Sequence, residues 1–472
     1  MKTGELRKRH GHMHNLWKIG IATAGAFVYT LLDGRKLSTR RRNSALARGK
    51  RFVVVGGGFA GVEAAAELVK QLARDDDATE VVLVDQNDYL LFTPMLTEAV
   101  GAQVEAHHII VPLKSFSPKI RVLKARVKDI SLAFRTVSFE DSHLQTLQAD
   151  YLILSLGATS NFHHIEGVAH AAYTLKSLED ARRIKDQALQ MLNQSAMEDD
   201  GGERRSMLTF VVAGGGYTGV ETIAALNELV RERATTNEEV RTLLVEPTGR
   251  LMSEVSPALA SYAQDQLENA GIEVKLNVGI NKVDGDEIVL SDGEHLRSKT
   301  LIWTAGVEAN PMMSKLGAAT GKVKSIKVDE SLAVPNVRGV WAVGDCAEIP
   351  EPGKKKSYGK TAQNATREGR LAAQNIFRQL RGKPVKPFRY KPIGQLALVG
   401  RHRGIAQISG FRFSGLVAYM MWRAIYIAKM PSMSQRLRVI SDWLLDVTLG
   451  PAAEYPPRSI SAPQEKAIAA QH

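Results

Sequence analysis

The 472-residue sequence has a single cysteine, Cys346. One thiol cannot build a disulfide framework, a cysteine zinc site or a redox-active dithiol within the chain. Apolar residues make up 44% and charged residues 24%, so the composition is that of an ordinary globular protein. We expect no metal site, because the run His10, His12 and His14 has no further ligands nearby.

Acidic residues are absent from residues 381–441, which contain 12 Lys and Arg. Residues 1–50 contain another 12, against only Glu5 and Asp33. The whole chain has a net charge of +12, whereas these flanks carry +12 and +10, so the body between them is acidic. Basic flanks of this kind suit either nucleic acid or an anionic membrane surface.

The apolar segment 16–32 carries one charge, Lys18. As a helix it is about 25 Å long, shorter than the ~30 Å hydrocarbon core of a bilayer. We interpret it as an N-terminal membrane anchor, spanning or interfacial; the alternative is a helix lying on the protein body. The basic residues that follow, among them Arg35 and Lys36, predict that the rest of the chain lies on the cytoplasmic face of the cell membrane.

Two further apolar helices are predicted near the C-terminus. Residues 413–430 are apolar nearly all round, and Pro431 ends that helix. Residues 433–449 place apolar side chains on one face, namely Leu437, Ile440, Trp443, Leu444 and Val447. Interleaved aromatic and basic residues favour a membrane interface, and the alternatives are a dimer interface or a core helix pair.

A dinucleotide-binding motif follows the first apolar strand, RFVVV. Gly56, Gly58 and Gly61 have the spacing G-x-G-x-x-G, a helical pattern follows, and the next strand ends at Asp85. The glycines permit a tight turn, close approach of a pyrophosphate and close helix packing, and the acid is placed to bind a ribose.

The same pattern recurs after the strand LTFVVA, with Gly214, Gly216, Gly219 and a strand ending at Glu246. Two complete copies predict a chain that binds two dinucleotides. An acid at Glu246 favours NADH over NADPH, although Arg250 is close in sequence.

Strands 151–161 and 300–310 end in glycine and are candidate crossovers between two domains, and a later strand turns at Gly344-Asp345 into a helical start. Residues 195–206 and 351–358 read as surface loops.

Together these residues resemble the two-dinucleotide-binding flavoproteins. The lack of a cysteine pair argues against the disulfide reductases and the sulfide:quinone oxidoreductases. The branch it resembles most is the type II NADH:quinone oxidoreductases, through the blocks GGGFAGVEAA, NDYLLFTPML, LGATSNF, GGGYTGVE, WTAGV, WAVGDCAEI, TAQNATREG and WRAIYIAKMP. That family does not account for the N-terminal 50 residues.

The resemblance implies an α/β fold of two Rossmann-like domains, the NADH domain inserted in the FAD domain, with a C-terminal membrane-docking helical region. The expected boundaries are a basic extension at 1–50, FAD-domain parts at 51–165 and 306–385, an NADH domain at 166–305, a membrane-association region at 386–450, and a disordered tail at 451–472.

The resemblance also implies a reaction: two electrons pass from NADH through FAD to a membrane quinone, without proton pumping, in a homodimer that binds no nucleic acid. The implied catalytic residues are Glu221 and Gln363. The implied cofactor-binding residues are Gly56, Gly58, Phe59, Ala60, Gly61, Asp85, Thr93, Pro94 and Asp345 for FAD, and Gly214, Gly216, Gly219, Glu246 and Gly306. Two other classes share both motifs: soluble NAD(P)H-dependent reductases of small electron carriers, and flavin-bearing signalling proteins whose basic patches bind DNA.

Overall fold

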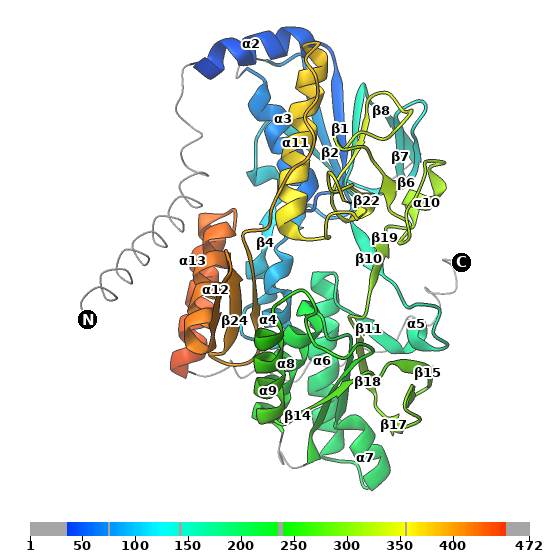
Figure 1. Ribbon diagram of the computed structural model, residues 1–472, viewed down its shortest axis with the longest axis vertical. Helices are drawn as coiled ribbons and strands as arrows, with labels where there is room; N and C mark the ends of the chain where they lie inside the picture. The colour runs from blue at the N-terminus through cyan, green and yellow to red at the C-terminus, as the bar shows by residue number, and fades with distance from the viewer. Residues whose placement is uncertain (1–34, 74–75, 141–143, 235–238, 355, 450–472) are drawn as a thin grey trace, which may run out of the picture.

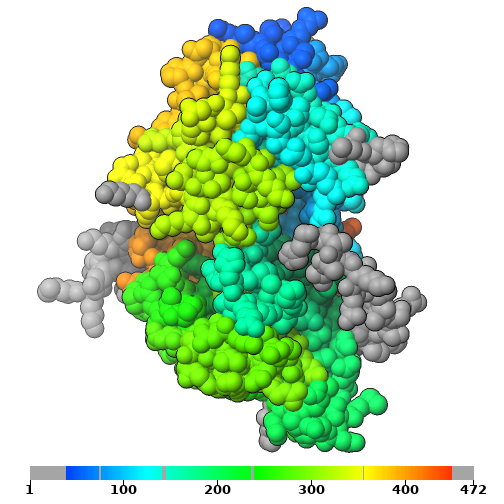
Figure 2. Space-filling model, turned by 90° about the vertical axis from the view of Figure 1, so that its right-hand side faces the viewer, coloured from blue at the N-terminus to red at the C-terminus, as the bar shows by residue number. Residues whose placement is uncertain are grey.

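The computed structural model describes residues 35–73, 76–140, 144–234, 239–354 and 356–449. The interpreted anchor at 16–32, the histidine run and the tail at 451–472 lie outside these residues. Figure 1 shows two lobes, each built on a twisted sheet, with the C-terminal helices along one side. Figure 2 shows the blue, cyan and yellow segments in one lobe and most of the green segments in the other.

The first lobe has a five-stranded parallel sheet in the order β21-β9-β1-β2-β5. Its strands are β1 (Arg51–Val55), β2 (Glu80–Asp85), β5 (Ile120–Lys124), β9 (Tyr151–Leu154) and β21 (Val340–Ala342). The centre of β1 is buried on both faces, because helices cover the sheet. One face carries α3 (Phe59–Gln71), against which α11 (Ala362–Leu380) packs.

The second lobe repeats this plan, with a parallel sheet in the order β11-β18-β12-β13-β14. Its elements are β11 (Ala172–Thr174), α6 (Leu178–Ser195), β12 (Thr209–Ala213), α8 (Tyr217–Arg233), β13 (Arg241–Glu246), α9 (Pro257–Asn269), β14 (Ile272–Leu276) and β18 (Thr300–Trp303). The expected α/β fold is confirmed, with the second sheet inserted between β9 and β21 of the first. The chain crosses between lobes at the antiparallel pair β10 (Ala158–Ser160) and β19 (Val307–Ala309).

Smaller elements complete the lobes. They are α2 (Arg35–Ala47), β3 (Tyr89–Leu91), η2 (Thr93–Met95), α4 (Leu96–Val100), η3 (Ala106–Ile109), β4 (Ile110–Pro112), η4 (Leu113–Ser115), β6 (Arg126–Ser131), β7 (Thr136–Glu140), β8 (Leu144–Gln148), α5 (Val168–Ala171), α7 (Gly201–Met207), β15 (Ile280–Asp284), β16 (Glu287–Leu290), β17 (His295–Arg297), α10 (Met312–Lys315), β20 (Ile326–Lys327), η6 (Gly344–Cys346) and β22 (Ala347–Glu348).

The structure refines two expectations about local conformation. Residues 195–206 are not a loop throughout: α7 begins at Gly201, because the Asp200 carboxylate accepts hydrogen bonds from the backbone N–H groups of Gly202 and Glu203. The helical start expected at Gly344 is a single 3₁₀ turn, Gly344–Cys346, which leads directly into strand β22.

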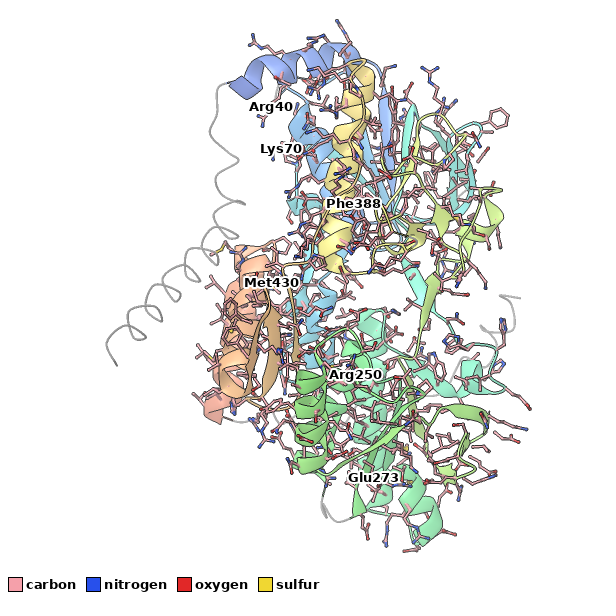
Figure 3. All side chains as sticks on the ribbon, in the orientation of Figure 1. Arg40, Lys70, Arg250, Glu273, Phe388 and Met430 are labelled. Atoms are coloured by element: carbon pink, nitrogen blue, oxygen red, sulfur yellow. The ribbon has the colours of Figure 1, made fainter. Side chains whose placement is uncertain are left out.

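The C-terminal region consists of a three-stranded antiparallel sheet and two helices. The strands are β23 (Gly394–Leu398), β24 (Gly404–Ile408) and β25 (Phe411–Ser414), and the helices are α12 (Gly415–Lys429) and α13 (Met433–Leu449). Met430, buried at the turn between the helices, is labelled in Figure 3. Among the described residues no helix has the length and apolar character needed to cross a membrane.

Helix α13 presents its apolar face outward. Leu437 and Leu444 are 62% and 61% exposed, whereas the inner face carries Gln435, Asp442 and Asp446 with Val439. Trp443 was predicted to share the apolar face, but it points inward, where its indole N–H reaches a buried carboxylate. The helix therefore contacts the protein body through polar groups together with Val439 and the Trp443 ring.

The crossing of α3 and α11 gives a stability prediction. A Cβ at Gly369 would overlap the carbonyl oxygen of Ala60, so Gly369→Ala forces the helices apart. We expect a loss of about 1–3 kcal/mol in unfolding free energy, measured as a lower thermal midpoint by circular dichroism. The matched control is Gly201→Ala at the start of α7, where a Cβ has its nearest neighbour at 3.9 Å. Equal midpoints for the two variants would contradict the role given to this crossing.

Candidate functional site

The first glycine motif forms a tight turn between β1 and α3. Gly56 has φ +106°, and a Cβ at Gly61 would overlap the Gly56 carbonyl oxygen. Gly58 differs, because no atom lies within 4 Å of a Cβ built there. Gly58 is also the N-cap of α3, with no side chain bonded to the first N–H groups of the helix. The open approach and the free N–H groups fit a pyrophosphate.

Asp85 lies at the end of β2, directly behind this turn. Its carboxylate accepts hydrogen bonds from the backbone N–H groups of Gly57 (2.6 Å) and Asn87 (2.7 Å). Burial raises the pKa of Asp85, and these two hydrogen bonds oppose that rise. The acid is therefore held at the edge of the turn, as the motif requires.

Asp345 approaches the same turn from the far end of the chain. A Cβ at Gly344 would lie 3.2 Å from the Cβ of Ala60, so the two turns touch. The Gly344 N–H donates to the Glu368 carboxylate (2.8 Å), and Lys360 Nζ donates to the Asp345 carbonyl (2.6 Å). Burial raises the pKa of Asp345, while Lys360 and Lys176 oppose that rise. This places a carboxylate flanked by two lysines beside the first nucleotide turn.

Thr93 and Pro94 form the short η2 turn on the neighbouring side. The preceding Phe92 packs edge-on against Phe59, with ring centroids 5.8 Å apart. The predicted FAD-side residues of α3, η2, β2 and η6 therefore come together at one end of the first sheet. Cys346, next to Asp345, is buried, and burial raises the pKa of its thiol to about 11. It is protonated at neutral pH and is no redox nucleophile.

The second glycine motif reproduces this geometry between β12 and α8. Gly214 has φ +108°, a Cβ at Gly219 would overlap the Gly214 carbonyl oxygen, and the position of a Cβ at Gly216 is open. Glu246 accepts hydrogen bonds from the N–H of Gly215 (2.5 Å) and from Thr248. The two turns have the same geometry, and both fit a dinucleotide.

Gly306 lies where the chain crosses back to the first lobe. It has φ +155°, and a Cβ there would lie 2.6 Å from His163 Nε2. Its carbonyl accepts a hydrogen bond from the Asn161 N–H (3.1 Å). The structure thus accounts for this glycine by the close passage of two backbone segments.

Glu221, one of the two implied catalytic residues, lies in the first turns of α8. Its Oε1 accepts a hydrogen bond from the backbone N–H of Leu398 (3.0 Å), at the end of β23. Burial raises the pKa of Glu221 to about 8. The same side chain therefore joins the helix that starts at the second nucleotide turn to the C-terminal region.

Gln363, the other implied catalytic residue, lies at the start of α11. Its Oε1 accepts from the Tyr390 hydroxyl (2.9 Å), and its Nε2 donates to the carbonyl of Gly394 (3.3 Å). Gly394 and Leu398 are the two ends of β23, which at ~3.3 Å per residue is about 13 Å long. Glu221 and Gln363 therefore contact opposite ends of one strand and do not touch each other.

Sequence reasoning missed several residues around this strand. Tyr390 orients Gln363, and Arg367 stacks over the Tyr390 ring at 4.0 Å. Glu98 is buried beneath α13, where it accepts a hydrogen bond from Trp443 Nε1 (3.2 Å). An acid within the apolar run MLTEAV was a usable signal for Glu98, whereas nothing local marks Tyr390.

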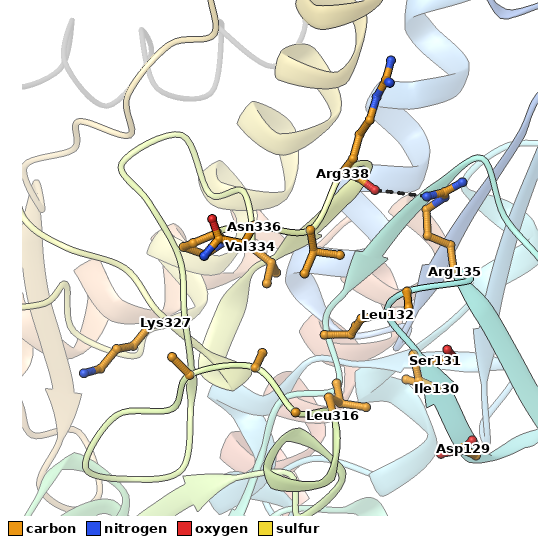
Figure 4. A pocket seen from close by; sticks show the side chains of 16 residues that line it. Asp129, Ile130, Ser131, Leu132, Arg135, Leu316, Lys327, Val334, Asn336 and Arg338 are labelled. Carbon is orange, nitrogen blue, oxygen red and sulfur yellow. Dashed lines mark hydrogen bonds between the residues drawn. The ribbon is translucent and has the colours of Figure 1, made fainter.

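A cavity with a volume of about 750 Å³ lies elsewhere in the first lobe, between β6 and the loop around Asn336 (Figure 4). Arg135 donates a hydrogen bond across its rim to the Arg338 carbonyl (3.3 Å), as drawn in Figure 4. It contains none of the predicted site residues, and both glycine turns lie outside it. We therefore place the candidate site at the turns and not in this cavity.

Comparison with known proteins identifies the class. The family model described as pyridine nucleotide-disulphide oxidoreductase matches residues 50–369, and a model described as the NDH2 C-terminal domain matches residues 393–450. The chain belongs to the pyridine nucleotide-disulphide oxidoreductase family. The second match falls on β23–β25 and the two C-terminal helices, and together the matches confirm the resemblance to the type II NADH:quinone oxidoreductases.

Relatives are found in bacteria and in mitochondria. The type II NADH:quinone oxidoreductase of Staphylococcus saprophyticus is 27% identical, over 80% of this chain and 94% of the relative. External NADH-ubiquinone oxidoreductase 2 of Saccharomyces cerevisiae is 25% identical, over 87% of this chain and 83% of the relative. The solved structure of NDH2 from Plasmodium falciparum in complex with NADH has a TM-score of 0.78 and 20% identity, covering 86% of this chain and 99% of that chain.

The two open glycine positions give a paired prediction. Gly216→Ala places a methyl group in front of α8 and weakens NADH binding about 10- to 100-fold, the cost of one or two displaced charge-assisted hydrogen bonds. The amount of bound flavin stays unchanged in that variant. Gly58→Ala has the opposite effect, because it lowers the flavin content and leaves the affinity for NADH unchanged. Isothermal titration with NADH and the visible absorbance of the purified protein measure the two effects. Loss of both ligands in either variant would contradict separate sites.

Proposed function

We propose that this protein oxidises NADH and reduces a membrane quinone through bound FAD, without pumping protons. The overall reaction, NADH + H⁺ + quinone → NAD⁺ + quinol, transfers two electrons and consumes one proton. FAD supplies the redox chemistry when it is bound, accepting electrons from NADH and passing them on. The observation that carries the proposal is Glu221, which links the second nucleotide turn to the C-terminal region.

Glu221 acts as the proton donor to the quinone oxygen. With a pKa raised to about 8, the carboxyl group is protonated at pH 7 and has a proton to give. Above pH 8 the proton is lost, so the donor disappears as the pH rises. Tyr426 and Trp422 of α12 both interact with Glu221, and Trp422 opposes the rise in the pKa of its carboxyl group.

Gln363 orients the quinone. Its amide nitrogen has two N–H groups, one of which donates to Gly394, and the other can donate to a quinone or quinol oxygen. Tyr390 holds the amide oxygen and fixes which way the amide faces.

NADH is the preferred substrate over NADPH. Glu246 is a ribose-binding acid and would repel a 2′-phosphate. Arg250, labelled in Figure 3, donates through its guanidinium to the Ser253 carbonyl (2.6 Å), so it is engaged within its own loop.

The outward apolar faces of α12 and α13 bind the membrane surface. Nine of the fifteen large exposed apolar side chains of the described residues lie on these helices, namely Leu416, Val417, Met420, Met433, Leu437, Ile440, Leu444, Leu445 and Val447. The same part of the chain, residues 381–441, contains 12 Lys and Arg and no acid. Apolar and cationic groups together suit an anionic lipid surface. The enzyme would then work at the cytoplasmic face, with residues 16–32 as an additional anchor and a homodimer as the assembly.

The reaction is tested with Glu221→Gln. The variant keeps the acceptor for Leu398 N–H but has no proton to donate, so oxidation of the reduced flavin by a short-chain quinone slows about 10²-fold. Flavin reduction by NADH stays within twofold. Stopped-flow absorbance separates these half-reactions, and the fall in the wild-type quinone rate above pH 8 disappears in the variant. Wild-type protein that NADH bleaches but no quinone reoxidises would instead favour a soluble reductase.

Membrane docking is tested with the double variant Leu437→Glu/Leu444→Glu. Two carboxylates on the outer face of α13 oppose insertion, and the variant moves from the pellet to the supernatant when sedimented with anionic liposomes. NADH oxidation with a soluble quinone stays within twofold. The control Phe134→Glu changes an exposed side chain of the first lobe and leaves liposome binding intact. Unchanged sedimentation of the double variant would assign this face to a protein contact, such as a dimer interface.

A further inference from the structure

Glu98 is a buried carboxylate that the reaction outlined above does not use. It lies in the middle of α4 and is 1% exposed, among apolar neighbours that include Met95, Leu96 and Val100. An acid is costly at such a position unless it has partners or a task.

The partners of Glu98 leave part of the carboxyl group free. Oε1 accepts from Trp443 Nε1 (3.2 Å), and Arg423 Nη2 lies 3.9 Å from the same oxygen, the limit of an ion pair. Oε2 is buried and, among the described residues, has no hydrogen-bond partner; the same holds for Nε of the neighbouring Arg423. Buried polar groups of this kind are those that internal water serves.

Glu98 lies between two carboxylates of α8. Glu221 and Glu228 are seven residues apart, about 10 Å along the helix, which is too far for direct proton exchange. Helix α4 runs along this stretch: a Cβ at Gly101 would be 2.9 Å from Ala225, midway between the two acids. Gln103, just beyond, donates to Glu228 Oε2 (2.7 Å). Glu98 interacts electrostatically with both acids, since its charge raises the pKa of Glu221 and the charge of Glu228 raises the pKa of Glu98.

The far end of this row of acids reaches solvent. Side-chain exposure rises from 1% at Glu98 to 14% at Asp446 and 34% at Glu232. Arg401 is paired with Glu232, and its Nη2 lies 3.7 Å from Asp446. These three residues form an entrance where α8, α13 and the β23–β24 loop meet.

Glu98 and Glu228 have pKa values near neutrality. Burial raises the pKa of Glu98 and of Glu228 to about 7, the nearby acids add to the rise, and arginines oppose it. The charged and titratable groups facing the two acids are Arg423, Tyr419, Asp446 and Glu221 around Glu98, and Arg401, Glu232 and Asp446 around Glu228. A group with a pKa near the working pH both takes up and releases a proton readily.

We propose that Glu98 and Glu228 relay the proton consumed in each turnover from the Asp446–Arg401 entrance to Glu221. The inference rests on the proposed function, since it supplies the proton that Glu221 gives to the quinone. One proton enters at Glu228, passes through Glu98 and internal water to Glu221, and replaces the proton that Glu221 has lost. The relay moves no electrons, and its stoichiometry is the single proton of the overall reaction.

The test is Glu98→Gln, which keeps an acceptor for Trp443 Nε1 but carries no exchangeable proton. We expect quinone reduction in multiple-turnover stopped flow to fall on the order of tenfold, with a larger solvent deuterium isotope effect. Reduction of the flavin by NADH stays within twofold, and the thermal midpoint is retained. Glu228→Gln gives the same pattern, weaker because it lies nearer to solvent. The matched control is Glu268→Gln on the exposed face of α9, which alters neither rate.

A single-turnover experiment separates this relay from the role of Glu221. One turnover uses the proton already on Glu221, so Glu98→Gln behaves like wild type in the first turnover and slows only from the second. Equal slowing in the first turnover, or loss of NADH reduction as well, would make Glu98 a structural residue and overturn the relay. Wild-type rates over many turnovers would also overturn it. A normal first turnover in Glu221→Gln would instead contradict the proposed function.

Discussion

Both nucleotide sites depend on one constraint, the close contact of two backbone segments at a glycine. In each lobe the helix after the first strand starts so close to the preceding turn that the third motif glycine lies against the carbonyl oxygen of the first. This contact aims the free N–H groups of α3 and α8 past Gly58 and Gly216, where a Cβ would have no neighbour within 4 Å. The main chain thus provides the shape and the positive charge that a pyrophosphate needs, and the surrounding side chains determine which nucleotide binds.

In the C-terminal region, helix α13 turns its apolar face outward, whereas a surface helix usually turns its apolar face toward the core. Helix α13 contacts the body through Gln435, Asp442 and Trp443, which bond Ile110, His108 and Glu98 respectively. Because these bonds fix its rotation, the helix cannot turn its apolar side inward without leaving buried polar groups unpaired. The outward apolar face is therefore a stable feature of the fold, and the polar inner face encloses a charged interior between α4, α8 and α12.

Local sequence predicted the features that depend on local chain geometry. The two glycine motifs, their strands and the acids at Asp85 and Glu246 could be predicted, because each turn is specified within about 30 residues. The surroundings of Glu221, Glu98 and Gln363 could not, since they come from β23, α12 and α13 far along the chain. Trp443 was misplaced for the same reason: helical periodicity puts it at the boundary between faces, and only the distant Glu98 decides which way the indole points.

Because the second lobe is inserted in the sequence of the first, the chain order determines which lobe can fold first during synthesis. All strands of the second sheet lie between residues 172 and 303. The first sheet, in contrast, is complete only when β21 has been synthesised, and its helical layer only when α11, which ends at Leu380, has been synthesised. The lobe that comes second in the sequence is therefore the first whose sheet can close during synthesis. Until α11 emerges, α3 has an uncovered face, so the first nucleotide site can be completed only after the second lobe is in place.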